Sequence, residues 1–360
     1  MSRYPTSLLA LTILFLSTCS ELCLLHNLAA QEAEEKSKTS EETKVLRIGM
    51  IGLDTSHCPA FTKLINAEDA EGNLAKMRVT AAFPGGSPDI ASSRDRIEGF
   101  TEQLSAMGVE IVDSIEELLP KVDAILLESV DGRKHLSQVL PVFRAGKPVF
   151  IDKPLAASLE EAIAIDLLAK KYKARWFSSS SLRFSPEIAK FRSGEHTSGD
   201  IVGASAWSPC ALEKTHSDLF WYGVHGVETL FTAMGTGCKS VTRTFTEDLD
   251  LVAGTWEDGR IGTFRGIRKG KTGYGMVVFG SKWIDSSAKY QGYAPLVDEI
   301  AEFFLGGEPP VNPEETLEMF TFMQAADVSK EQGGQPVQLD QVWAEALQAA
   351  EKRILILDQP

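Results

Sequence analysis

The sequence predicts an α/β protein with two domains: a doubly wound parallel sheet, then an open, mostly antiparallel sheet. Its 360 residues exceed what one typical core holds. Between residues 45 and 181, short β-branched runs alternate with helical patterns, which indicates a parallel sheet. After residue 200, several strand patterns follow one another without helices between them, which favours an antiparallel sheet.

The composition is that of an ordinary globular protein, with 43% hydrophobic and 24% charged residues. The formal net charge of -14 argues against a nucleic-acid partner, because phosphate backbones select basic surfaces. The five cysteines form no C-x-x-C pair, and no Cys/His spacing resembles a zinc site. We therefore expect neither a metal site nor a disulfide framework.

The N-terminus has the pattern of a secretory signal peptide. Arg3 precedes an apolar run over residues 8–16, which is shorter than the ~20 residues of a membrane span. We expect residues 1–30 to be removed after Ala30 and the protein to be exported, to the periplasm or another extracytoplasmic space. Lipoprotein attachment at Cys19 is a weaker match, and an uncleaved anchor is the alternative. Residues 31–44 are rich in Glu, Lys, Ser and Thr and predict a disordered linker.

The first domain, residues 45–181, is predicted element by element from its apolar runs. Ser114 with Glu117 and Ser158 with Glu161 form capping boxes that begin two of its helices. The predicted strands are 45–52, 78–83, 109–112, 122–127, 147–151 and 175–179. The predicted helices are 59–67, 90–107, 115–119, 135–145 and 158–171.

The turn after the first strand is where such a sheet would bind a dinucleotide pyrophosphate. Of the G-x-G-x-x-G pattern, residues 52–57 keep only Gly52, and Asp54 replaces the glycine that lets the backbone approach phosphate. A carboxylate there would repel an anion, whereas Thr55, Ser56 and the following helix start could donate hydrogen bonds to one.

The end of the second strand also departs from the dinucleotide-binding pattern. Pro84 stands where a carboxylate for the ribose hydroxyls is expected. A ribose phosphate could instead be received by Gly85, Gly86, Ser87 and Arg94. Both departures lead us to expect weak or atypical affinity for free NAD.

The strand 147–151 ends in Asp152, Lys153 and Pro154. Ligands of open α/β sheets bind at the carboxyl ends of strands, and a partly desolvated lysine there can move protons. A surface Asp–Lys pair is the alternative interpretation.

The second domain, residues 182–360, contains a helical stretch over residues 218–231. Within it, Tyr222, His225 and Glu228 are spaced three apart and share a face. The sequence around His57, His196 and His216 indicates no comparable role for them, although His57 lies in the turn after the first strand. The predicted strands are 200–207, 240–246, 251–256, 259–267 and 273–280, and the later helices are 293–305 and 313–330.

Four segments together resemble the Gfo/Idh/MocA oxidoreductase family, which includes glucose–fructose oxidoreductase and inositol dehydrogenase. The resemblance covers about residues 45–340, and Asp152 stands where the family's Glu-Lys-Pro motif has glutamate. The segments are the first strand 48–52; residues 122–125 with His135 and 145–154; residues 223–228; and the tail 303–334.

The resemblance implies a Rossmann domain, an α/β substrate domain, and hydride transfer between a sugar or polyol and a tightly bound NAD or NADP. It implies that Lys153 orients substrate and nicotinamide, and that His225 is the acid/base. Trp221 occupies the place of an aspartate found in many members, so Tyr222 is the candidate substitute. The implied cofactor-binding residues are Gly52, Asp54, Thr55, Ser56, His57, Ser129, His135, Asp152 and Lys153.

Two other functions remain open, because the glycines and the ribose carboxylate are missing and export separates a protein from free dinucleotide. One is an exported sugar-binding protein without redox activity, and the other is a lyase or hydrolase. We also expect a homo-oligomer, a dimer or tetramer, formed through an exposed face of the second sheet carrying Val252, Ile261 and Phe264.

Overall fold

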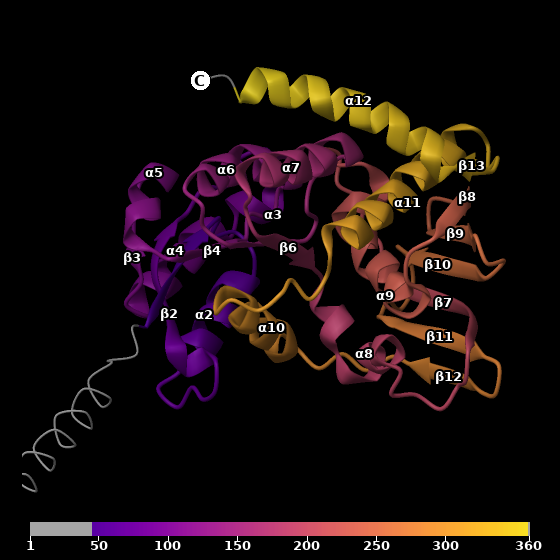
Figure 1. Cartoon of the computed structure of the whole chain (residues 1–360), viewed down its shortest axis with the longest axis horizontal. Helices are drawn as coiled ribbons and strands as arrows, with labels where there is room; N and C mark the ends of the chain where they lie inside the picture. Colours follow the sequence, from indigo (N-terminus) through magenta and orange to yellow (C-terminus); the bar gives the residue numbers. More distant parts are fainter. Residues whose placement is uncertain (1–44, 359–360) are drawn as a thin grey trace, which may run out of the picture. The chain divides into compact units, whose positions relative to one another are not determined.

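The computed structural model describes residues 45–358, so the predicted signal peptide and linker lie outside the described residues. None of the helices in this range is long and apolar enough to cross a membrane. The described chain contains two sheets (Figure 1).

The first sheet is wholly parallel and has the strand order β3-β2-β1-β4-β5-β6, which confirms the predicted doubly wound sheet. Its strands are β1 Leu46–Ile51, β2 Met77–Phe83, β3 Glu110–Ile111, β4 Ala124–Leu127, β5 Val149–Asp152 and β6 Trp176–Ser179. Its helices are α2 His57–Ile65, α3 Ala91–Arg94, α4 Ile97–Ala106, α5 Ile115–Leu118, α6 Gly132–Arg144 and α7 Leu159–Tyr172. Both predicted serine caps form, since the Ser114 and Ser158 hydroxyls accept from the Glu117 and Glu161 amides. The Glu117 carboxylate accepts from the Asp113 amide (3.2 Å) rather than from that of Ser114.

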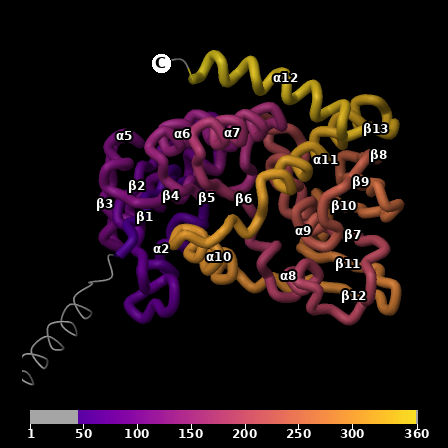
Figure 2. The backbone as a smooth tube through the Cα atoms, viewed as in Figure 1, coloured from indigo at the N-terminus to yellow at the C-terminus, as the bar shows by residue number. Residues whose placement is uncertain are grey.

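Helices from the end of the chain return to this first sheet. One face is covered by α2, α4 and α10 (Ala294–Phe304), whose Phe61, Leu104 and Phe303 share a core with strand residues such as Ile48. On the other face α6 and α7 pack, and α12 (Leu339–Leu357) lies along α7 (Figures 1 and 2). Because the C-terminal segment completes both layers, the two sheets belong to one compact unit, residues 46–360.

The second sheet has the order β12-β11-β7-β10-β9-β8-β13 and is antiparallel except for the parallel pair β7–β10. Helices α9 and α11 pack against it. Its strands are β7 Ile201–Pro209, β8 Cys238–Phe245, β9 Leu249–Trp256, β10 Ile261–Ile267, β11 Gly275–Gly280, β12 Ile284–Ser287 and β13 Val337–Gln338. The remaining helices are α8 Pro186–Ser193, the π-helical turn η4 Leu219–Gly223, α9 Val224–Met234 and α11 Pro313–Glu331.

The prediction of Val252 and Phe264 as exposed residues is wrong, because both are fully buried. They pair across β9 and β10 on the face that meets the helices, whereas Ile261 is of opposite parity and is 57% exposed. Residues 90–107 form two helices rather than one, broken at Asp95 and Arg96. The short strands β12 and β13 and the helix α12 were not predicted.

Candidate functional site

A cavity of about 400 Å³ lies at the carboxyl edge of the first sheet. This edge is where open α/β sheets bind ligands, and β1 and β4 mark the point where the strand order reverses. The cavity is lined by residues from the segment that forms the first sheet and from the segment that forms the second. From the first segment they are Thr55, Ser56, His57, Ala91, Ser92, Arg96, Val130 and Lys153; from the second they include Ser181, Leu182, Glu213, Trp221, Tyr222, His225, Tyr274, Tyr290 and Tyr293.

Gly52 ends β1 with a φ of +84°, a conformation that L side chains rarely adopt. A Cβ atom at this position would lie 2.3 Å from the Ser129 hydroxyl and 2.5 Å from the Ser129 backbone. The retained glycine is therefore required for the close approach of the β1 and β4 loops. Ser129 is therefore packed against Gly52 and does not line the cavity. Its hydroxyl donates to the Gln138 side chain (2.9 Å).

Asp54 is fully buried, and its carboxylate points into the protein rather than lining the cavity. It accepts hydrogen bonds from the Ser93 hydroxyl (2.6 Å) and the Val130 amide (2.8 Å). Burial raises its pKa, while these two hydrogen bonds act in the opposite direction. Asp54 thus joins the segments after β1 and β4 to α3, and the expected repulsion of a cofactor phosphate by this carboxylate has no support in the geometry.

The start of α2 and the segment containing α3 form the part of the cavity suited to an anion. Thr55, Ser56, Ser92 and Arg96 all line the cavity. The Ser92 hydroxyl is buried and has no hydrogen-bond partner within residues 45–358. A free hydroxyl, a guanidinium and a helix start fit one phosphate of a dinucleotide. The alternative phosphate residues, Ser87 and Arg94, bond to Asp131 and Asp95 instead.

His135 is fully buried in α6 and does not line the cavity. Its Nε2 lies 2.7 Å from the Ser129 carbonyl oxygen and its Nδ1 lies 3.1 Å from that of Leu155. Burial lowers the pKa of His135. Its position therefore indicates a structural link between loops rather than a direct contact with a cofactor.

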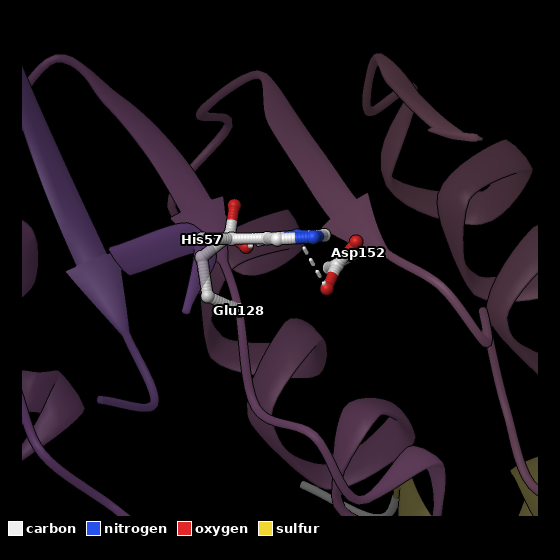
Figure 3. A group of neighbouring side chains, drawn as sticks. All are labelled: His57, Glu128 and Asp152. Carbon is white, nitrogen blue, oxygen red and sulfur yellow. Dashed lines mark ion pairs between the residues drawn. The ribbon is translucent and has the colours of Figure 1, made fainter. Parts of the chain in front are cut away.

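Beside the cavity, His57 approaches two buried carboxylates at the ends of neighbouring strands (Figure 3). Leu126 of β4 pairs with Phe150 of β5, so two residues further on Glu128 and Asp152 emerge side by side on the same face of the sheet. His57, the first residue of α2, lies over this face. Its Nδ1 is 3.0 Å from Asp152 Oδ2 and 3.6 Å from Glu128 Oε2.

The charges in this group shift one another's pKa values. Burial, aided by the Asp152 charge, raises the pKa of Glu128 to about 7. Burial alone would raise the pKa of Asp152, but the neighbouring His57 and Lys153 outweigh it and lower the pKa. Burial would lower the pKa values of His57 and Lys153, but Asp152 outweighs it and raises both. The Lys153 ammonium lies 3.4 Å from Asp152 Oδ2.

His225, on α9, lines the same cavity. Its Nδ1 is 2.7 Å from the Ser180 hydroxyl, in the loop after β6. Burial, followed by the nearby Lys153 charge, lowers the pKa of His225 to about 3, so the imidazole is neutral at neutral pH. The structure thus places Lys153 and His225 on one cavity.

Glu228 does not contact His225 directly but holds the loop that carries its partner. Its carboxylate accepts from the Ser180 amide (2.7 Å), the Ser179 hydroxyl and Arg183 Nε (2.8 Å). Arg183 also donates to Glu315 (2.9 Å), so this loop is tied to α11. Glu228 therefore positions Ser180.

Four tyrosines also line the cavity. Tyr222 lies in the π-helical turn before α9, and its ring meets the His225 ring edge-on with a centroid distance of 5.2 Å. The ring centroids of Tyr274 and His225 lie 5.8 Å apart. The rings of Tyr290 and Tyr293 contact each other, and the ring centroids of Tyr293 and His57 lie 4.7 Å apart. Burial raises the pKa of Tyr290 to about 12. Aromatic faces with hydroxyl tips suit a small molecule that has both C–H surface and hydroxyl groups.

Sequence reasoning missed Glu128, Ser180 and the tyrosines after residue 270. The signal for Glu128 was present, because it follows β4 in the same position as Asp152 in β5, and adjacent parallel strands bring equivalent ends together. The later tyrosines lie in segments between strands and helices, where no periodicity indicates which side chains converge.

Comparison with known proteins relates the first sheet to redox enzymes. Residues 46–179 match a family model described as an oxidoreductase family with an NAD-binding Rossmann fold. Inositol 2-dehydrogenase of Cereibacter sphaeroides is 34% identical over 114 residues, which are 31% of this chain and 29% of the relative. The rhizopine catabolism protein MocA of Rhizobium meliloti is 24% identical over 123 residues, 34% of this chain and 38% of the relative. These matches span about a third of each relative's length.

Solved structures show that the likeness of fold extends further along the chain. Scyllo-inositol dehydrogenase from Lactobacillus casei, solved with NAD(H) and scyllo-inositol, has a TM-score of 0.67 at 15% identity, covering 82% of this chain and 100% of that one. A probable dehydrogenase from Thermotoga maritima has a TM-score of 0.66 at 21% identity, with coverage of 82% and 100%. The two-sheet architecture is therefore one that dehydrogenase structures share.

Proposed function

We propose that this chain, whose residues 46–179 match the model of the Gfo/Idh/MocA oxidoreductase family, oxidises or reduces a sugar, polyol or related molecule with NAD or NADP. The observation that carries the proposal is the position of Lys153 and His225 on one cavity at the carboxyl edge of the parallel sheet. One residue comes from each sheet's segment, so a substrate between them contacts both.

The residues that would hold the dinucleotide line the same cavity. Thr55 and Ser56 at the start of α2 would donate to a phosphate, and Arg96 would offset its charge. The unpaired hydroxyl of Ser92 fits the same group. When bound, the nicotinamide supplies the hydride acceptor or donor.

The chain's own residues would manage the proton and the substrate oxygen. When an alcohol loses a hydride, a base must take the hydroxyl proton and a positive group must hold the oxygen as charge develops. His225 can accept the proton at Nε2 when its Nδ1 carries hydrogen and donates to Ser180. The Lys153 ammonium would hold the oxygen, and Tyr222 and Tyr274 would pack against the carbon skeleton.

A substrate screen tests this function. Purified protein is incubated with NAD or NADP and a panel of inositols, sugars and sugar acids, and formation of reduced nicotinamide is followed by absorbance. We expect turnover with at least one hydroxylated substrate. Released small molecules are identified by mass spectrometry, because a tightly bound cofactor would copurify. Absence of both bound dinucleotide and any dinucleotide binding by calorimetry would overturn the proposal.

A further inference from the structure

We propose that His57, Glu128 and Asp152 form a binding site for one divalent cation. The three potential ligand atoms, one from each residue, lie within 4.8 Å of one another (Figure 3). They come from the start of α2, the end of β4 and the end of β5, the rigid edge at which this sheet binds ligands. The proposal does not depend on the redox function, since it concerns binding of an ion alone.

The distances are those between ligands of one metal ion. Two atoms bound at about 2.1 Å to the same ion lie about 3.0 Å apart at a right angle and about 3.4 Å apart at a tetrahedral angle. His57 Nδ1 lies 3.0 Å from Asp152 Oδ2 and 3.6 Å from Glu128 Oε2. Both separations that involve His57 are therefore close to those expected for ligands of one ion.

Unsatisfied polar atoms point to a missing partner. Both oxygens of Glu128, both oxygens of Asp152 and Nδ1 of His57 are buried and make no hydrogen bond in the described part of the chain, where their partners are the ion pairs of His57 with both carboxylates and of Lys153 with Asp152. Both carboxylate residues have no exposed surface. Burying a carboxylate without hydrogen bonds is costly, and buried charges are normally paired or coordinate a metal.

The residues nearby do not already fill this role. Lys153 reaches Asp152 at 3.4 Å, but within residues 45–358 no lysine or arginine forms an ion pair with Glu128. Two carboxylates and one ammonium leave one net negative charge when His57 is neutral. A divalent cation carrying one bound hydroxide or alkoxide would neutralise it. A protonated His57 would neutralise it too, so binding must be measured.

One imidazole nitrogen and two carboxylates select the class of ion. Zn²⁺ and Mn²⁺ accept mixed nitrogen and oxygen ligands, and the absence of thiolate from the set disfavours soft ions such as Cu(I). Three protein ligands also leave at least one coordination position for water or a substrate oxygen. Because His57 and Lys153 line the cavity, the ion would lie at its wall.

Calorimetry with ZnCl₂ and with MnCl₂ tests the site on the full chain after treatment with a chelator. We expect one equivalent of at least one ion to bind with micromolar or tighter affinity. Glu128→Gln and Asp152→Asn should each weaken binding at least tenfold. The matched control is Asp166→Asn, a buried aspartate of α7 paired with Lys170, which should bind like the wild type.

Spectroscopy of the wild type keeps the proposal testable if a variant does not fold, which thermal melting would reveal. Zinc-edge X-ray absorption should show one nitrogen and at least two oxygen neighbours and no sulfur. Failure of both ions to bind, unchanged affinity in folded Glu128→Gln and Asp152→Asn, or sulfur neighbours would each overturn the site. None of these readouts uses turnover, so a failed substrate screen and a failed cation site remain distinguishable.

Discussion

The Ser180 hydroxyl lies 2.7 Å from Nδ1 of His225, so the loop after β6 orients an imidazole of α9. Ser180 is itself held by Glu228, which accepts from its amide. This contact joins the segment of the first sheet to that of the second at the cavity. The position of His225 therefore depends on both segments.

We predict that Ser180→Ala lowers kcat roughly tenfold while leaving KM nearly unchanged, because the His225 ring loses the partner that orients it. Steady-state kinetics on the substrate found by screening would measure this. Ser180→Thr keeps the hydroxyl and should recover much of the rate. An alanine variant with wild-type kcat would show that the contact does not matter for turnover.

Lys153→Met and His225→Asn should each lower turnover by roughly 10²-fold or more, the usual worth of a positioned acid/base. Methionine keeps the volume but removes the charge, and asparagine keeps hydrogen bonding without a useful pKa. The control is Lys121→Met, which removes an exposed ion pair with Glu110 far along the sheet. If both site variants turn over like the wild type, the proposed catalytic roles are wrong.

Asp54→Ala should lower the free energy of unfolding by about 1–3 kcal/mol, because the Ser93 hydroxyl and the Val130 amide lose their buried acceptor. Urea denaturation measures the change. Asp95→Ala removes an exposed partner of Arg94 and should cost less than about 1 kcal/mol. Equal effects of the two changes would contradict the structural role of Asp54.

His216 should make folding stability fall in mild acid. Its Nε2 accepts from the Gly132 amide (3.2 Å), and burial lowers its pKa from 6.5 to about 4. Arg133 and His135 also lower this pKa, whereas Asp131 and Glu213 raise it. Because the unfolded chain takes up the proton first, this contribution is complete above about pH 6.5 and is lost as pH falls through about 4.

Melting temperatures measured from pH 7 down to pH 4.5 test this dependence. In His216→Gln the side-chain carbonyl can still accept from the Gly132 amide but cannot titrate. The melting temperature of the wild type should therefore fall further over this pH range than that of the variant. The same pH dependence in both proteins would exclude His216 as its source.

The outward face of the second sheet should mediate self-association. Leu251, Ile261, Phe279 and Ile284 are exposed there, from 38% to 69% of their surface. We predict a dimer or tetramer by light scattering at micromolar concentration, shifted toward monomer by Ile261→Glu combined with Ile284→Glu. Leu355→Glu changes an exposed leucine of α12 and should have no effect. A wild-type protein that is only monomeric would refute the prediction.

Much of the first sheet could be predicted because its signals are local. Apolar runs such as residues 122–127 and 147–151 are long enough to mark strands, and Ser114 and Ser158 mark helix starts through hydrogen bonds to residues three positions away. The break near Asp95 was not predicted, and the contact that fixes the helix before it, the hydrogen bond from Ser93 to Asp54, joins residues 39 positions apart and leaves no local signal.

The sequence by itself determined the alternation of strands and helices and the placement of Lys153 at a strand end, since these follow from hydrophobic period and turn chemistry. Through the family resemblance of residues 223–228, it also indicated His225 as a candidate acid/base. Only the tertiary structure decided which face of β9 and β10 is buried, reversing the expectation for Val252 and Phe264. It alone brought Glu128 beside Asp152 and His57, and Ser180 beside His225. These pairs depend on strand register and on the packing of distant segments, which local pattern does not encode.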